Sequence, residues 1–88
     1  MVNTTNNHYQ TSDTSIACYL ITEGFTLLQI DYAQPRYVYT FDGNIDDMRR
    51  HEHLYLTGKA LTDPSVFTRI NRKLMRTIKN LQQWGVNP

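Results

Sequence analysis

The run from Tyr37 to Phe41 limits the possible folds of this chain more than any other segment. Each of its five residues is aromatic or β-branched, a composition typical of a β-strand. Because side chains alternate across a strand, Tyr37, Tyr39 and Phe41 share one face. The other face has the smaller Val38 and Thr40. Either the aromatic face packs under other elements as core, which we expect, or it is exposed and its rings can stack on unpaired bases.

The segment before this strand supplies a partner for it. Residues 25–31 place Phe25 and Leu27 on one side and Leu28 nearer the other, a pattern that predicts a strand. Pro35 has no backbone donor and biases the residue before it toward an extended conformation, which suits a hairpin connection. The two strands are therefore expected to form an antiparallel hairpin.

Two shorter segments have the start and stop signals of helices. The first covers residues 13–23, with Asp13 or the serine before it as N-cap and Gly24 as its stop. The second covers residues 45–56, with Asn44 as N-cap, two acids in its first turn and a Thr-Gly pair at its end. Both are short helices that must pack on the hairpin.

Residues 64–83 predict a longer amphipathic helix. Asp63 is an N-cap residue followed by proline, and neither glycine nor proline occurs again until Gly85. The apolar residues recur at steps of three and four, which places them on one stripe: Phe67, Ile70, Leu74, Ile78 and Leu81. The expected order is α-β-β-α-α, an α+β domain over residues 11–84 with an antiparallel hairpin packed on helices. A flexible polar arm over residues 1–10 and a short tail over residues 85–88 complete the expected organisation.

An isolated hairpin is marginally stable and leaves both its edges open. The aromatic strand has no edge-blocking charge after Arg36. Pairing with the same strand of a second molecule would complete a four-stranded antiparallel sheet and satisfy two-fold symmetry. We therefore expect a homodimer, with an interface made by Tyr37, Val38, Tyr39, Thr40 and Phe41.

Membrane, secretion and catalytic signals are missing from the sequence. No apolar run approaches the ~20 residues of a membrane helix, and the first residues do not resemble a secretory signal, so we expect a cytoplasmic protein. The single Cys18 lies among apolar helix residues and is expected to be a packed thiol. His51 and His53 are two residues apart on a helix and point away from each other, which argues against a metal site. Phosphate loops, dinucleotide fingerprints and nucleophile elbows are also absent, so we expect no catalytic residue, no metal, no cofactor and no enzymatic activity.

The charges are divided unevenly along the chain. Through Pro64 there are four cations against eight acids, a formal charge of −4, whereas from Ser65 onward there are five cations and no acid, +5. At about 100° per residue, all five lie on the side of the last helix opposite its apolar stripe. They are Arg69, Arg72, Lys73, Arg76 and Lys79.

This concentration of cations has two interpretations. A surface helix needs polar residues outside, and cations suit its C-terminal end. A helix that needed only solubility would usually interleave acids as i,i+4 partners, so we expect an anionic partner instead. Our leading hypothesis is an accessory or regulatory module that binds nucleic acid through this helix. The alternative is a protein-interaction module, such as a phage or mobile-element inhibitor or adaptor, that docks the same helix on an acidic protein surface.

Several short motifs occur together in one order along the chain. They are Thr11-Ser12-Asp13, Ile16-Ala17-Cys18-Tyr19-Leu20, Glu23-Gly24-Phe25, Tyr37-Val38-Tyr39-Thr40-Phe41, and Asp63-Pro64 followed by Phe67. With them the chain resembles a family of small bacterial domains of unknown function, over about residues 11 to 81. The resemblance implies a bacterial, phage or other mobile-element accessory protein. It brings no catalytic residue to this chain.

Overall fold

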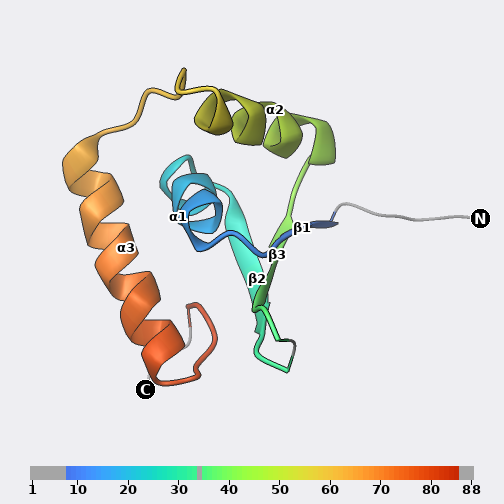
Figure 1. The fold of residues 1–88 in the computed structure, drawn as a ribbon, viewed down its shortest axis with the longest axis vertical. Coiled ribbons are helices and arrows are strands. Elements are labelled where there is room, and N and C mark those ends of the chain that lie inside the picture. Colours follow the sequence, from blue (N-terminus) through green and yellow to red (C-terminus); the bar gives the residue numbers. More distant parts are fainter. Residues whose placement is uncertain (1–7, 34, 86–88) are drawn as a thin grey trace, which may run out of the picture.

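The computed structural model describes residues 8–33 and 35–85. Within these residues the chain forms three strands and three helices (Figure 1): β1 (His8–Thr11), α1 (Thr14–Thr22), β2 (Thr26–Asp31), β3 (Val38–Asp42), α2 (Ile45–Leu56) and α3 (Pro64–Lys79). The α+β class and the expected order α-β-β-α-α are confirmed, with one further strand at the start. None of these helices combines the length and the hydropathy that crossing a membrane would require.

The three strands form one antiparallel sheet in the order β1-β3-β2. Phe41 of β3 is opposite Tyr9 on one side and Leu27 on the other. Between Leu27 and Gln29 the register with β3 shifts, so that one residue of β2 is left unpaired. This bulge allows Leu27 and Ile30 to lie on the same buried face although they are three residues apart.

The place of β3 corrects the expectation of an open aromatic edge. β1 pairs with residues 39–42 of β3 on one edge, and β2 pairs with residues 38–42 on the other, so β3 is not the edge strand that the predicted pairing with a second copy requires. A homodimer stays a prediction, and an edge contact would have to use another strand.

β1, which pairs with one edge of β3, lies mostly within the segment that the sequence predicted to be a flexible arm, residues 1–10. β1 is held by Tyr9, which is buried against the core. Burial and a hydrogen bond with the Glu52 side chain of α2 raise the pKa of Tyr9. The rest of the predicted arm, residues 1–7, and residues 86–88 of the predicted tail lie outside the described residues.

The aromatic face of β3 is core. Tyr39 and Phe41 are fully buried, whereas Tyr37 precedes the strand and is 36% exposed. The hydroxyl of Tyr39 lies 2.7 Å from the hydroxyl of Thr14, which satisfies its polar tip. Burial raises the pKa of Tyr39. The expected core packing is thus confirmed for two of the three rings.

α1 is the centre of the domain and lies between the sheet and α3 (Figure 1). Five consecutive residues from Ile16 to Leu20 are buried, because one side of the helix faces the strands and the other faces α3. Cys18 is among them, with its sulfur 3.6 Å from the carbonyl oxygen of Phe67 in α3. Burial raises the pKa of the Cys18 thiol. The expected packed thiol is confirmed.

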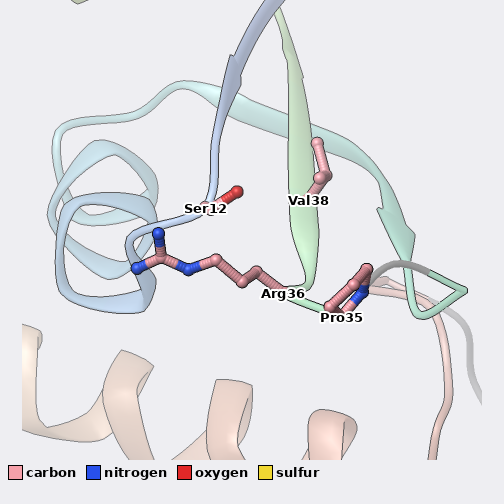
Figure 2. A pocket seen from close by; sticks show the side chains of 4 residues that line it. All are labelled: Ser12, Pro35, Arg36 and Val38. Carbon is pink, nitrogen blue, oxygen red and sulfur yellow. The ribbon is translucent and has the colours of Figure 1, made fainter.

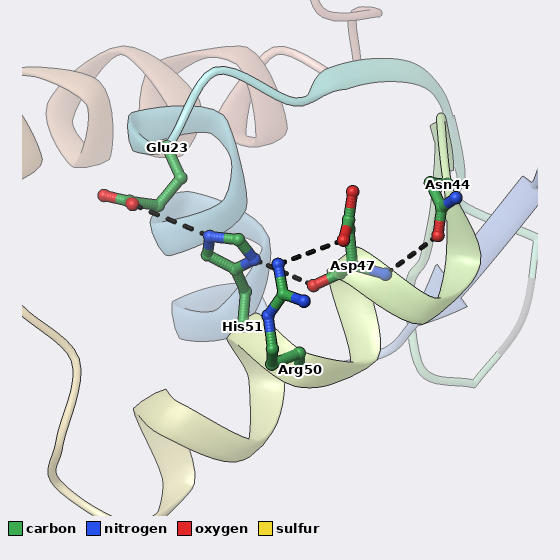
Figure 3. Close-up of polar contacts among 5 residues, drawn as sticks. All are labelled: Glu23, Asn44, Asp47, Arg50 and His51. Atoms are coloured by element: carbon green, nitrogen blue, oxygen red, sulfur yellow. Dashed lines mark hydrogen bonds and ion pairs between the residues drawn. The ribbon is translucent and has the colours of Figure 1, made fainter.

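A histidine fixes the junction between α1 and α2 (Figure 3). The Nδ1 atom of His51 donates to the carbonyl oxygen of Asp47, 2.8 Å away. Its Nε2 atom lies 3.9 Å from a carboxylate oxygen of Glu23, the C-cap of α1. The ring of His51 also meets Phe25 edge-on, with 5.1 Å between centroids. The His51 side chain therefore contacts three neighbours, which indicates a structural role for it at this junction.

All three helices begin with the side-chain caps that the sequence predicts. The carboxylates of Asp13 and Asp63 and the side-chain oxygen of Asn44 each accept a backbone hydrogen bond from the first turn of their helix. α1 and α2 also end close to the predicted residues. Local chemistry was sufficient at these ends because each cap uses neighbours in the sequence.

The end of α3 was predicted wrongly. The helix stops at Lys79 instead of continuing to residue 83. Leu81 adopts a left-handed conformation with φ of 52°, and the amide of Gln82 donates to the carbonyl of Thr77. This is the hydrogen-bond pattern that glycine normally permits at a helix end. The prediction failed because a leucine takes the position where glycine was the expected signal.

After this turn the chain folds back onto β2, at the outer edge of the sheet. The side-chain amide of Gln83 accepts from the backbone N–H of Ile30 (2.7 Å) and donates to its C=O (2.8 Å). The hydroxyl of Tyr32 donates to the carbonyl of Gln82 at 2.6 Å. A side chain thus replaces a neighbouring strand at this edge, which protects it from pairing with another chain. We refer to residues 81–85 as the C-terminal clip.

Candidate functional site

α3 is the outermost element of the domain, on the far side of α1 from the sheet (Figure 1). Leu74 is fully buried and packs against the core together with Phe67, Ile70 and Ile78, which are partly buried. These four residues form the apolar stripe that the sequence predicts. Leu81, the fifth predicted member, lies beyond the helix and is 63% exposed.

The opposite side of α3 carries the five cations found in the sequence, here called the basic face. All five are exposed: Arg69, Arg72, Lys73, Arg76 and Lys79. The ion pairs within 4.0 Å among the described residues are Arg50 with Asp47 and His51 with Glu23, so no carboxylate neutralises the basic face in this part of the chain. The predicted position of the five cations on α3, away from its core stripe, is confirmed.

The nearest acid along the sequence is occupied with another task. One carboxylate oxygen of Asp63 accepts from the backbone N–H and the hydroxyl of Ser65, at 2.9 and 2.8 Å. These hydrogen bonds are the main reason why the pKa of Asp63 is lowered. Asp63 therefore caps the N-terminus of α3, and it forms no ion pair within 4.0 Å with the described cations of the helix.

The basic face has a centre and two flanks. Taking Phe67 as zero on the helix circumference, the three arginines fall between about 140° and about 200°. Lys73 falls near 240° and Lys79 near 120°, on opposite sides of the arginines. The planar guanidinium groups thus form a central stripe, and the ammonium groups border it.

One flank is held by an aromatic ring that sequence reasoning missed. The Nζ atom of Lys73 lies 4.8 Å from the centroid of the Trp84 ring, within the range of a cation–π interaction. Trp84 belongs to the C-terminal clip and packs on the core at its other contacts. Because the contact depends on the early end of α3 and the chain reversal at Leu81, no sequence period could reveal it.

The aromatic platform that the sequence left open as an alternative does not form. Tyr39 and Phe41 are buried, and Tyr37 meets Tyr32 edge-on with 4.9 Å between ring centroids. Among the five residues of the predicted dimer interface, Val38 and Thr40 lie half-buried on the other face of the sheet. The structure therefore brings the five cations together on one face, but it does not place the predicted aromatic residues beside them.

A shallow surface hollow lies between the β2–β3 connection and the segment that joins β1 to α1 (Figure 2). It is lined by Ser12, Pro35, Arg36 and Val38. Arg36 is the charged group there, and no carboxylate or histidine lines the hollow with it. Elsewhere His51 is held against Phe25, whereas His53 is exposed, so the two histidines do not converge on one point.

Comparison with known proteins places the chain in a family without assigning an activity. A search of curated proteins and a search of solved structures found no match. The profile of a family described as "Domain of unknown function (DUF5659)" matches residues 6–83. This match includes β1 and extends to Gln83 of the C-terminal clip. The resemblance to a small domain of unknown function is thus confirmed, and the chain belongs to the DUF5659 family.

Proposed function

We propose that this protein is a small non-enzymatic accessory or regulatory module that binds nucleic acid through the basic face of α3. One observation carries the proposal: five exposed cations share one face of a peripheral helix, and none has a carboxylate partner among the described residues. Like charges this close repel one another, so the arrangement destabilises the free helix. A polyanion would offset that repulsion.

The phosphate backbone of a nucleic acid suits this face because it presents charges at a regular, short spacing. Each neutralised phosphate releases condensed counterions, which favours binding and makes it weaken with salt. Each cation that contacts a phosphate should add about −0.9 to the slope of the logarithm of the binding constant against the logarithm of salt concentration for duplex DNA, so the slope has a limit of about −4.5 for five contacts. A slope near zero would argue against phosphate contacts.

A protein partner is the alternative, with the same helix docked on an acidic surface. Arginine anchors also occur at the centre of protein interfaces, but there they are packed among aromatic or apolar residues, and other charges lie at the rim. The centre of the basic face consists of arginines, and the nearest exposed apolar residue of α3 is Met75 at one side. This composition favours a polyanion over a protein surface.

The test is a titration of labelled duplex DNA, single-stranded DNA and RNA at two salt concentrations, read by fluorescence anisotropy. We expect saturable binding that weakens with salt. The affinity should fall by at least about tenfold in the Arg72→Glu/Arg76→Glu variant. The matched control is Arg49→Glu/Lys59→Glu, which changes the net charge equally at exposed residues away from α3. Equal losses in both variants would contradict the proposal. Failure to bind any of the three would favour the protein partner, with α3 as the surface to present as bait.

A further inference from the structure

The shape and side chains of α3 narrow the class of nucleic acid, on the assumption that the proposed function is correct. We propose that α3 enters the major groove of B-form duplex DNA. In this arrangement Arg69, Arg72 and Arg76 face the edges of the base pairs. Lys73 and Lys79 contact the phosphates on the two walls of the groove.

The position of α3 permits this docking. The helix has 16 residues, which gives it a length of about 24 Å. It packs on α1, and α1 separates it from the sheet, so its outer side projects from the domain (Figure 1). A major groove about 12 Å wide and about 8.5 Å deep accepts one α-helix. A helix set into the middle of the domain, such as α1, could not be inserted in this way.

The order of residue types around the helix matches the two kinds of contact in a groove. Arginine has a planar fork of donors that can bind the O6 and N7 atoms of guanine together, whereas lysine is a compact point charge suited to phosphate. On α3 the arginines occupy the centre of the exposed face, between about 140° and about 200°. Lys73 and Lys79 lie on opposite flanks, at about 240° and about 120°. The guanidinium groups would thus point at the groove floor and the ammonium groups at its walls.

The spacing along the helix axis also fits base pairs. Arg69 and Arg76 are seven residues apart, which corresponds to about 10 Å at ~1.5 Å per residue. Successive bases along a strand are separated by about 3.4 Å, so the three arginines extend over about three to four base pairs. Each arginine can therefore reach a different base pair.

Other nucleic acids fit this surface less well. Binding of single strands relies on aromatic rings with a free face for stacking. Here Tyr39 and Phe41 are buried, and Lys73 covers one face of Trp84 while the ring packs on the core. Tyr37 is 36% exposed, but it lies in the connection between β2 and β3 and not on α3. The major groove of an RNA duplex is deep and narrow and excludes protein side chains. Of the three classes, B-form DNA matches α3 best.

The first experiment selects binding sites from a pool of duplexes with randomised sequence and then compares the selected site with an unrelated duplex. We expect guanines in the selected site. The affinity for an RNA duplex of the same sequence should be at least about tenfold lower than the affinity for the selected DNA duplex. Exchanges that conserve charge then separate base contacts from phosphate contacts. Arg72→Lys and Arg76→Lys should each lower the preference for the selected site by at least about fivefold while the binding to unrelated DNA remains.

Lys73→Arg and Lys79→Arg are the matched controls, because they keep the charge on the flanks and should change that preference by less than about twofold. Circular dichroism of the four variants checks that these exposed substitutions preserve the fold. Salt-dependent binding without a selected sequence, or equal affinity for DNA and RNA duplexes, would overturn the inference and leave the proposed function standing. Equal loss of preference in the lysine and arginine exchanges would do the same. Absence of binding to every nucleic acid would overturn both.

Discussion

α2 and α3 are both amphipathic surface helices, yet they distribute charge in opposite ways. α2 has Asp46 and Asp47 in its first turn and mixes acids with cations along its length. Its Arg50 lies 3.0 Å from the Asp47 carboxylate. α3 has five cations and, after its N-cap, no acid. The charge pattern of α2 is typical of a surface helix that needs only stability and solubility, and this difference is the reason why we propose a ligand for α3 and not for α2.

The two helices also differ in how they are attached to the domain. α2 contacts both α1 and β1, whereas α3 packs on α1 through one stripe. The largest loss of stability is therefore expected when the buried anchor of α3 is removed. Leu74→Ala should reduce the free energy of unfolding by about 2–5 kcal/mol, because Leu74 is fully buried and its removal leaves a cavity. Chemical denaturation measures this change.

Met75→Ala provides the control for Leu74→Ala, since Met75 neighbours Leu74 on the same helix but is 47% exposed. We expect it to change stability by less than about 1 kcal/mol. Similar costs for both variants would mean that α3 is not held by the predicted stripe.

The C-terminal clip is a second attachment that α2 does not have. Gln83→Ala should cost about 1–2 kcal/mol, because the N–H and C=O of Ile30 lose both hydrogen bonds to the side-chain amide. Gln82→Ala serves as the control, since Gln82 contacts Tyr32 through its backbone carbonyl. Thermal unfolding of the two variants compares them. A larger effect at Gln82 than at Gln83 would contradict the role given to the clip.

The ends of the two helices offer a substitution that should stabilise the protein. α2 ends with Gly58 at φ of 76°, whereas α3 has Leu81 at φ of 52° in the same position. Leu81→Gly should raise the free energy of unfolding by about 0.5–1 kcal/mol, because glycine adopts the left-handed conformation without the clash that a side chain causes. Leu81→Ala, which keeps a β-carbon, should not produce this gain. Denaturant titration of both variants is the measurement, and equal stabilities would refute the explanation.

The fold was predictable where the deciding contacts are local. The starts of the three helices were predictable because each N-cap side chain accepts a hydrogen bond from a residue two or three positions later. The N-caps are Asp13, Asn44 and Asp63. β1 was missed because its pairing depends on Phe41, which is distant in sequence, and a polar segment with one tyrosine gives no period. The placement of β3 at the centre of the sheet follows from that same strand.

The candidate site divides in the same way. The basic face was predictable because helical periodicity alone places its five residues together. Trp84 was not, since its contact with Lys73 requires the turn at Leu81, where no glycine marks the helix end. Sequence reasoning thus found the charges of the site and missed the ring that restrains one of them.

The smallest expected change in stability is also the one that distinguishes the two helices most directly. Arg72→Glu gives α3 the mixture of charges found in α2, because the new carboxylate lies three residues after Arg69 and four before Arg76. The free protein should become more stable by a few tenths of a kcal/mol, as like-charge repulsion is replaced by attraction. The reverse change, Asp47→Arg in α2, should reduce stability, since it breaks the pair with Arg50 and places a cation at a helix N-terminus.

Denaturation at low and high salt measures the effects of Arg72→Glu and Asp47→Arg on stability, and both effects should shrink with salt. If Arg72→Glu stabilises the free protein while it weakens nucleic-acid binding, then the uniform charge of α3 is a cost that its ligand offsets; if it destabilises the free protein, the cations serve the fold.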